Sequence, residues 1–261
     1  SELVAIDGNG LRNTVSDYDT PEQNFVSCVS AFSHQKGLVL GVKVMNNKQE
    51  SEINVVRELL EVLGLKEVVF TLDALHCQKK TLEAIVETGN DYLVKVKGNQ
   101  PTLLKKIEEK VKFGEAVKRY EDKERTRDRY TIREVEVFEL SEDFDESWKG
   151  ARSVIGVKRS GMRGDKSFKS QSYYLTSLFP KARIIPGAIR KHWGIENRLH
   201  WVKDVILEED VSPQKAGAAP INLALLKSWV LTLLRLHGFE GIKEGISRLS
   251  NNLDYLLSFC F

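Results

Sequence analysis

The chain has 261 residues, of which 41% are hydrophobic and 29% charged, a composition that excludes wholesale disorder and a fibrous repeat. A chain of this length buries about three quarters of its unfolded surface, so neither disulfides nor structural metals are needed for stability. The three cysteines have no CxxC spacing, which argues against a disulfide framework or a cysteine zinc site and favours a reducing, intracellular compartment. The net charge of +2, taken alone, argues against a nucleic-acid partner.

No segment of the sequence predicts export or a membrane span. The N-terminus lacks the basic and apolar regions of a signal peptide. The most apolar stretch, residues 221–236, is shorter than a bilayer span and carries Lys227 and Arg235. It is apolar nearly all round, so we expect a helix buried in the fold or against a partner. The sequence therefore predicts a cytoplasmic protein without membrane contact.

The near-neutral mean hides an uneven distribution of charge. Between Trp148 and Lys203 there are 13 basic and 2 acidic residues, a net charge of +11, which leaves −9 for the rest of the chain. A positive segment that also carries aromatic residues is suited to pairing with phosphates and stacking on bases. A basic surface that contacts only solvent explains the same charge, so both interpretations stay open.

The first hundred residues predict strands and then helices alternating with strands. Residues 3–6 are a short apolar run that ends in an Asp-Gly-Asn-Gly turn signal. Apolar runs at 25–32 and 37–45 predict two further strands. We then expect a helix at 51–64, a strand at 67–72, a helix at 77–88 and a strand at 92–96.

This order of elements predicts a mixed α/β sheet flanked by helices. Strands with short connections form an antiparallel meander, whereas strands joined through helices run parallel. Asp7 and Asp73 each stand at the carboxyl end of an expected strand. Since functional sites gather at strand ends in such sheets, we expect adjacent strands to bring these two carboxylates together.

The second half of the chain is less regular. We expect a charged helix at 103–117 and a later helix that Pro186-Gly187 opens and that runs to about Ile206. Between them, strands are expected at 130–140, 153–158 and 173–178, with turns at Ser160-Gly161 and Arg163-Gly164. The expected division is a core at 1–104, a β-rich insertion at 105–180, a second part of the core at 181–215 and a helical segment at 216–261.

The helix that ends near Ile206 is predicted to have an apolar face beside a polar one. At about 100° per residue, the apolar stripe consists of Ile195, Leu199, Val202 and Ile206. The face beside it carries His192, Glu196, His200 and Lys203, while Arg190, Lys191 and Arg198 point away.

Two aspartates after strands and one glutamate on a helix are the smallest ligand set for a two-metal site. Carboxylate oxygens suit Mg²⁺ or Mn²⁺, and two ions about 4 Å apart clamp both oxygens of a phosphoryl displacement. On the helix, His192, Glu196 and His200 repeat at i, i+4 and could instead hold Zn²⁺. Turn, cap and surface roles fit these acids as well, so residue types alone do not decide.

Four groups of short motifs occur in order along the chain. They are Ala5-Ile6-Asp7-Gly8; Leu72-Asp73-Ala74 with Cys77-Gln78; Asp91-Tyr92-Leu93-Val94 with Lys97-Gly98-Asn99-Gln100-Pro101; and His192-Trp193-Gly194-Ile195-Glu196-Asn197 with Leu199-His200-Trp201. Together they resemble the DDE transposases of bacterial insertion sequences, of the H-repeat-associated type within the IS-four-like group. The resemblance extends from about Ala5 to Asn222.

The resemblance implies a ribonuclease-H-like core, interrupted by a mostly β insertion before the catalytic glutamate. Asp7, Asp73 and Glu196 match the catalytic triad, which implies two Mg²⁺ ions, replaceable by Mn²⁺, and metal-dependent DNA cleavage and strand transfer. The implied partner is double-stranded DNA, at element ends and target, with a homodimer on DNA at the bacterial nucleoid. DNA contacts are expected from Lys97, Asn99, Gln100, Arg133, His192, Arg198, His200 and Lys203.

Some positions depart from the family's pattern. Asn9 stands where a lysine is usual, and Asp128-Arg129-Tyr130 replaces a His-Gly-Arg block, so DNA contacts are expected to differ. The chain begins six residues before Asp7, and we expect the family's helical N-terminal region to be missing. Two alternatives stay open: a catalytically inactive or host-adopted relic that binds DNA, and a zinc hydrolase built on the helical histidines.

Overall fold

The structure is a computed structural model that describes residues 1–11, 14, 25–46, 51–141, 144–211 and 217–258. Cys260, one of the three cysteines, lies outside these ranges. The chain divides into two compact units. The first unit consists of Ser1 and Leu65–His192, and the second of Glu2–Gly64 and Trp193–Phe261.

The second unit is built on an antiparallel meander. Its strands are β1 (Leu3–Gly10), β2 (Val26–Ser33) and β3 (Val39–Asn46). β2 pairs with both neighbours, as the short connections predict.

The turn expected after Ile6 does not form, because β1 continues through Gly10. Asp7 therefore pairs with Ser30 inside the strand and does not stand at its end. Position 8 favours glycine because the side chain of Glu52 lies close to the backbone there, not because the chain turns. A Cβ on residue 8 would lie 2.6 Å from a carboxylate oxygen of Glu52.

Helices cover both faces of this meander. On one face, α1 (Glu52–Leu63) begins after Ser51 and ends at Gly64, whose φ of 56° is the left-handed conformation of a helix C-terminus. A Cβ on Gly41 of β3 would touch this helix, while Val42 and Val44 pack on the other face with Ala224. The helices that follow position 193 are η3 (Glu196–His200), η4 (Val202–Ile206), α5 (Ala219–Leu236), α6 (Ile242–Ser250) and α7 (Leu253–Leu257).

Residues 221–236 are not buried on all sides within this chain, and burial against a partner, the other alternative predicted for them, stays a prediction. Ala224, Leu231 and Leu234 of α5 are buried, but Leu226 is 54% exposed and Trp229 58%. Helix α5 has apolar residues on more than one face, and the face that packs on the meander buries only some of them. Within the described ranges, α5 is the one helix long and apolar enough to cross a membrane, a weak indication that core helices also give.

The first unit contains a mixed sheet with the strand order β4-β5-β9-β8-β7-β6. β4 and β5 run parallel, as their helical connection predicts, and every later pair is antiparallel. The strands are β4 (Val69–Leu72), β5 (Asp91–Val96), β6 (Lys118–Arg125), β7 (Arg129–Glu139), β8 (Ser153–Arg163) and β9 (Lys166–Thr176).

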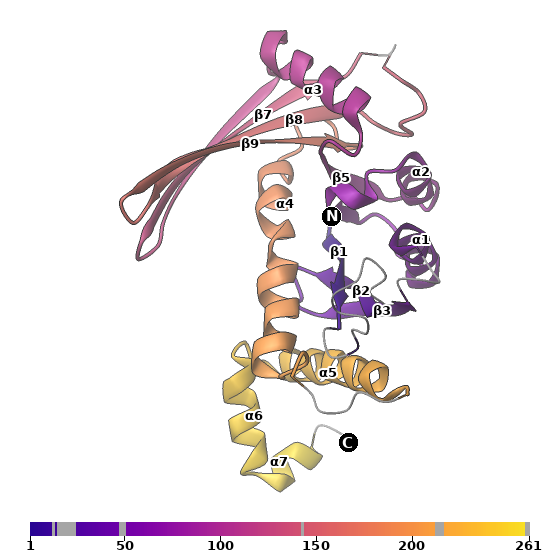
Figure 1. Cartoon of the computed structure of the whole chain (residues 1–261), viewed down its shortest axis with the longest axis vertical. Helices are drawn as coiled ribbons and strands as arrows, with labels where there is room; N and C mark the ends of the chain where they lie inside the picture. Colours follow the sequence, from indigo (N-terminus) through magenta and orange to yellow (C-terminus); the bar gives the residue numbers. More distant parts are fainter. Residues whose placement is uncertain (12–13, 15–24, 47–50, 142–143, 212–216, 259–261) are drawn as a thin grey trace. The chain divides into compact units, whose positions relative to one another are not determined.

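Four helical segments accompany this sheet. The long strands β7, β8 and β9 curve together, and α3 (Pro101–Phe113) packs along them (Figure 1). The other three are η2 (Ala74–His76), α2 (Lys79–Glu87) and α4 (Ile185–His192).

Two expectations for this region need correction. Ser160-Gly161 lies inside β8 and forms no turn, whereas the second predicted turn, at Arg163-Gly164, is confirmed: the hairpin turns there, and Gly164 has a φ of 55°. β6 was not expected at all. The helix expected to continue to Ile206 starts as α4, whereas its later residues are the π-helical segments η3 and η4.

Candidate functional site

One face of β1 runs along the π-helical segments of the second unit. Successive side chains of a strand alternate between faces, so Ala5, Asp7 and Asn9 point the same way. Ala5 lies in the core with Ile195 and Leu199 of the helix. Asn9 donates from Nδ2 to Oδ1 of Asp204 at 3.5 Å. Asp7, between them, is thereby held against the helix.

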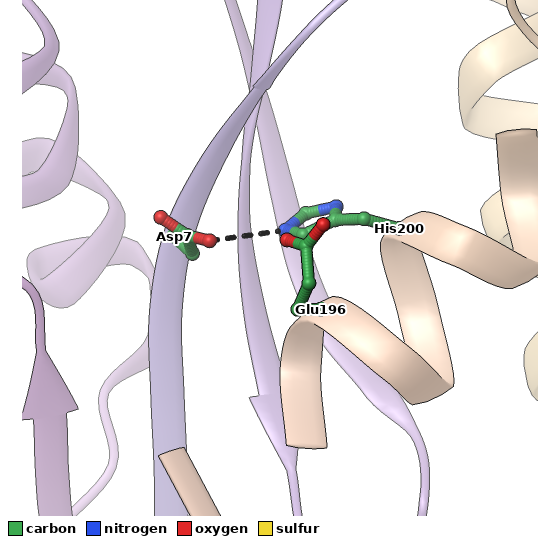
Figure 2. Close-up of side chains that lie close together, drawn as sticks. All are labelled: Asp7, Glu196 and His200. Atoms are coloured by element: carbon green, nitrogen blue, oxygen red, sulfur yellow. Dashed lines mark ion pairs between the residues drawn. The ribbon is translucent and has the colours of Figure 1, made fainter. Parts of the chain in front are cut away.

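Asp7 meets two side chains of η3. The Nε2 atom of His200 lies 3.5 Å from Oδ2 of Asp7. One donor atom from each of Asp7, Glu196 and His200 lies within 4.8 Å of the others, and Figure 2 shows the three side chains converging. His200 is only 2% exposed, whereas Glu196 is exposed to solvent. The group thus extends from a buried imidazole to an accessible carboxylate.

These three side chains fit a divalent ion. Two carboxylate oxygens and an imidazole nitrogen are ligands of Mn²⁺, Zn²⁺ and related ions, and carboxylates alone suit Mg²⁺. Bonds of about 2.1 Å would draw donor atoms to within roughly 4.2 Å of one another, so small side-chain movements suffice.

The alternative zinc set of His192, Glu196 and His200 is not the group that the structure brings together. Asp7, not His192, lies with Glu196 and His200. His192 belongs to the first unit, where its Nδ1 lies 3.0 Å from the hydroxyl of Thr71.

Lys203 is buried in an ion pair. Its Nζ lies 3.1 Å from Oε1 of Glu209, and the two side chains are 1% and 3% exposed. Burial raises the pKa of the Glu209 carboxyl, although the charge of Lys203 acts in the opposite direction. The resemblance implied that Lys203 contacts DNA, and no role was predicted for Glu209.

Asp73 lies in the first unit, directly after β4, as predicted. The Nζ atom of Lys97 is 3.6 Å from its Oδ1. Burial acts to raise the pKa of Asp73, but hydrogen bonding to the backbone of Ala74 and the charges of Lys97 and Lys95 outweigh it and lower the pKa. The carboxylate is therefore kept ionised in a cationic environment.

Two amides expected to contact DNA brace the turn that follows Asp73. Asn99 donates from Nδ2 to the carbonyl of Ala74 at 2.7 Å, and Gln100 donates from Nε2 to the carbonyl of Cys77 at 2.8 Å. Burial raises the pKa of the Cys77 thiol to about 12, so it is not a nucleophile at neutral pH.

Two of the expected arginines also have protein partners. Arg133 donates from Nη1 to Oδ2 of Asp122 at 2.7 Å, and Arg198 donates from Nη1 to the carbonyl of His34 at 3.0 Å. The guanidinium of Arg198 also lies over the ring of Phe32. Lys97, whose side chain is 53% exposed, is the most accessible cation beside Asp73.

Exposed basic residues gather where the hairpins β6–β7 and β8–β9 end. The strand register places these two hairpin ends side by side. The charge count along the sequence indicated a positive segment only from Trp148 onward and missed the contribution of the first hairpin. The exposed basic residues at this end are Arg125, Arg127, Arg129, Arg163, Lys166 and Lys169.

Asp7 and Glu196 converge within the second unit of a mixed α/β chain, and Asp73 follows β4 in the first unit. The chain belongs to the DDE transposase family, because the family described as "Transposase DDE domain" matches residues 1–219. The predicted family is therefore confirmed.

Named relatives of the chain come from Escherichia coli. It is 34% identical to YncI of strain O157:H7 over 95% of this chain and 65% of that protein. It is 33% identical to the H repeat-associated YhhI of strain K12, over 98% of this chain and 71% of YhhI. Both are named as candidate transposases, and the chain spans somewhat less than two thirds of YncI.

A solved structure has the same fold. The piggyBac transposase, in a synaptic complex with hairpin DNA, matches with a TM-score of 0.51 and 10% identity, covering 95% of this chain and 51% of that one. The likeness confirms the predicted fold class, a ribonuclease-H-like mixed α/β domain.

Proposed function

We propose that the chain is the catalytic domain of an insertion-sequence transposase that cleaves DNA at element ends and joins the freed ends to target DNA. The observation that supports this most is the convergence of Asp7 and Glu196 in a chain of the DDE family. Asp73 is proposed as the third carboxylate because it matches the family's second aspartate and its surroundings lower its pKa.

The proposed ligands are Asp7, Asp73 and Glu196. Two Mg²⁺ ions held by these carboxylates, or Mn²⁺ in their place, would activate water and stabilise the charge of the transferring phosphate. Glu196 is exposed, so a DNA phosphate can approach it from solvent. Hydrolysis at the element end frees a 3′-hydroxyl, which then attacks a phosphodiester of the target.

We propose that DNA binds along Lys97 and the exposed basic residues at the ends of the two hairpins. Lysine and arginine pair with phosphates irrespective of sequence. Asn99, Gln100, Arg133, Arg198 and Lys203 already have protein partners, so their proposed part in DNA binding is to hold the residues around them. His192 and His200 are proposed to act near the reacting phosphate.

The proposed organisation follows the family. Core parts 1–104 and 181–215 carry the catalytic residues, the insertion 105–180 guides DNA, and residues 216–261 complete the domain. A homodimer on DNA would bring two element ends together, and such a protein would work in the cytoplasm, at the nucleoid.

The test is cleavage of DNA that contains the sequences flanking the chain's own coding region. With Mg²⁺ or Mn²⁺ we expect nicks at the element ends, and none with EDTA. Asp7→Asn, Asp73→Asn and Glu196→Gln should each abolish cleavage and leave salt-sensitive DNA binding intact. An Asp73→Asn protein that cuts as well as the unmodified chain would disprove the proposed triad. DNA binding without cleavage in either metal would instead identify a non-catalytic relic.

A further inference from the structure

The imidazole of His200 is buried without a hydrogen-bond partner. The side chain is 2% exposed, and neither Nδ1 nor Nε2 makes a hydrogen bond within the described part of the chain. A buried polar group without a partner costs free energy, so such a group in a native fold requires an explanation. The ring of His200 points at Asp7, with Nε2 3.5 Å from Oδ2 (Figure 2).

The surroundings of the ring exclude a purely apolar role. Leu199, the preceding residue, packs in the core with Ala5 and Ile195. The apolar contact of this part of the helix with the core is therefore made by Leu199 and not by His200. His200 instead lies on the side of Asp7 and Glu196. A nitrogen directed at two carboxylates, with its own hydrogen-bonding capacity unused, is the arrangement expected of a metal ligand.

We propose that His200 is a direct metal ligand, which binds an ion through Nε2 together with Asp7 and Glu196. This inference rests on the proposed function, because Asp7 and Glu196 are the carboxylates assigned to the metal there. It adds a nitrogen ligand to a site otherwise made of oxygens. It also replaces the DNA contact that the resemblance implied for His200.

A nitrogen ligand changes which metal the site prefers. Oxygen ligands suit Mg²⁺, whereas imidazole favours transition metals, with affinity rising from Mn²⁺ through Co²⁺. This position should therefore bind Mn²⁺ more tightly than Mg²⁺. Removing His200 should weaken Mn²⁺ binding and leave Mg²⁺ binding nearly unchanged.

The experiment is pulsed electron paramagnetic resonance of Mn²⁺ bound to the 261-residue chain in the absence of DNA. A coordinated imidazole gives a nitrogen coupling that changes when the five histidines are labelled with ¹⁵N. We expect this coupling in the unmodified chain and its loss in His200→Gln. Calorimetry should show Mn²⁺ binding at least about tenfold weaker in that variant, since even outer-shell changes cost this much.

The matched control is His34→Gln, which alters another buried histidine of the second unit. It should leave both the nitrogen coupling and the Mn²⁺ affinity unchanged. The ¹⁵N labelling needs no substitution, so the absence of a nitrogen coupling in the unmodified chain contradicts the proposal even where His200→Gln folds poorly.

Two outcomes would overturn the role of His200. One is that Mn²⁺ binds to the unmodified chain without a nitrogen coupling and that this binding is lost in Asp7→Asn. That result would contradict the role of His200 and still support the proposed carboxylate site. The other is a coupling that persists in folded His200→Gln. Conversely, nitrogen coupling from His200 in a chain that cuts no DNA would support the ligand and contradict the proposed function.

Discussion

Charged side chains are arranged differently in the β6–β9 sheet and along η3 and η4. In the sheet, charges lie near the surface and pair across strands, as Glu136 does with Arg119 and Lys158. Along the π-helical segments, Lys203 is buried with its partner Glu209. The same residue types thus form the surface proposed to bind DNA in one region and a buried ion pair in the other, and the difference between the two is burial.

The largest expected effect comes from breaking the buried pair. Lys203→Met leaves the carboxylate of Glu209 buried without its cation, and we expect a loss of about 3–5 kcal/mol in the free energy of unfolding. Urea denaturation measures it. The double variant Lys203→Met/Glu209→Leu should recover much of the loss, and a single variant as stable as the unmodified chain would show that the pair gives no support.

Acid should act on the two regions in opposite directions. The pKa of Glu209 is raised from 4.5 by burial, so its contribution to stability is fully present below about 4.5 and is lost as pH rises through the folded pKa. Burial also acts to raise the pKa of Glu136, but hydrogen bonds from Lys158 and Arg119 outweigh it and lower the pKa. Its contribution is present above 4.5 and lost as pH falls.

The two glutamine variants separate these contributions. As pH rises above 4.5, Glu209→Gln should gain stability relative to the unmodified chain. As pH falls below 4.5, the stability that Glu136→Gln lacks relative to the unmodified chain should shrink, because the unmodified chain loses the contribution of its carboxylate there. Thermal unfolding at several pH values measures both slopes. If the stabilities of both variants relative to the unmodified chain changed with pH in the same direction, the predicted difference between the two regions would be contradicted.

Breaking the exposed pairs should cost little. Since Arg119 and Lys158 are more than half exposed, Lys158→Ala is expected to lower the free energy of unfolding by about 0–1 kcal/mol. Urea denaturation in low and high salt gives the value, which should shrink further in high salt. A loss as large as that of Lys203→Met would contradict the comparison.

The smallest effect on stability is expected at the hairpin ends. Arg163→Ala should leave unfolding unchanged but weaken DNA binding, and the slope of log affinity against log salt should fall by about 0.9 for each phosphate that the variant no longer neutralises. Lys118→Ala is the matched control, because it removes a charge from the opposite end of the same sheet. If Arg163→Ala and Lys118→Ala reduced the affinity for DNA equally, the proposed DNA surface at the hairpin ends would be contradicted.

Much of the fold could be predicted from sequence where one face of an element is apolar. The meander, the parallel pair β4–β5 and helices α1 and α2 follow from alternation, helical period and glycine stops. β6 could not, because its partly buried face carries Tyr120, Asp122 and Glu124 in place of apolar residues. The two acids are satisfied by Arg133 and Arg190, which are distant in sequence.

For the candidate site, sequence motifs could propose the residues, of which the structure brings Asp7 and Glu196 together with His200, but they could not give the geometry. Motifs identified Asp7, Asp73 and Glu196, and a turn signal misplaced Asp7, because glycine also serves close packing. Counting at 100° per residue gave Glu196, His200 and Lys203 a common face. That count predicted neither the burial of Lys203 nor its pairing with Glu209, which depends on the fold of the chain after Ile206.

The π-helical course of η3 and η4 has a consequence for how this gene can change. Each segment has more residues per turn than an α-helix. The contacts that Ala5 and Asn9 make with this helical region therefore depend on the number of residues between the helical residues that they touch. Deleting a single residue between Glu196 and Ile206 would rotate the residues that follow it by roughly a quarter turn about the helix axis. Lineages of this protein should therefore accumulate substitutions here while keeping the spacing between Glu196 and Glu209 constant in length.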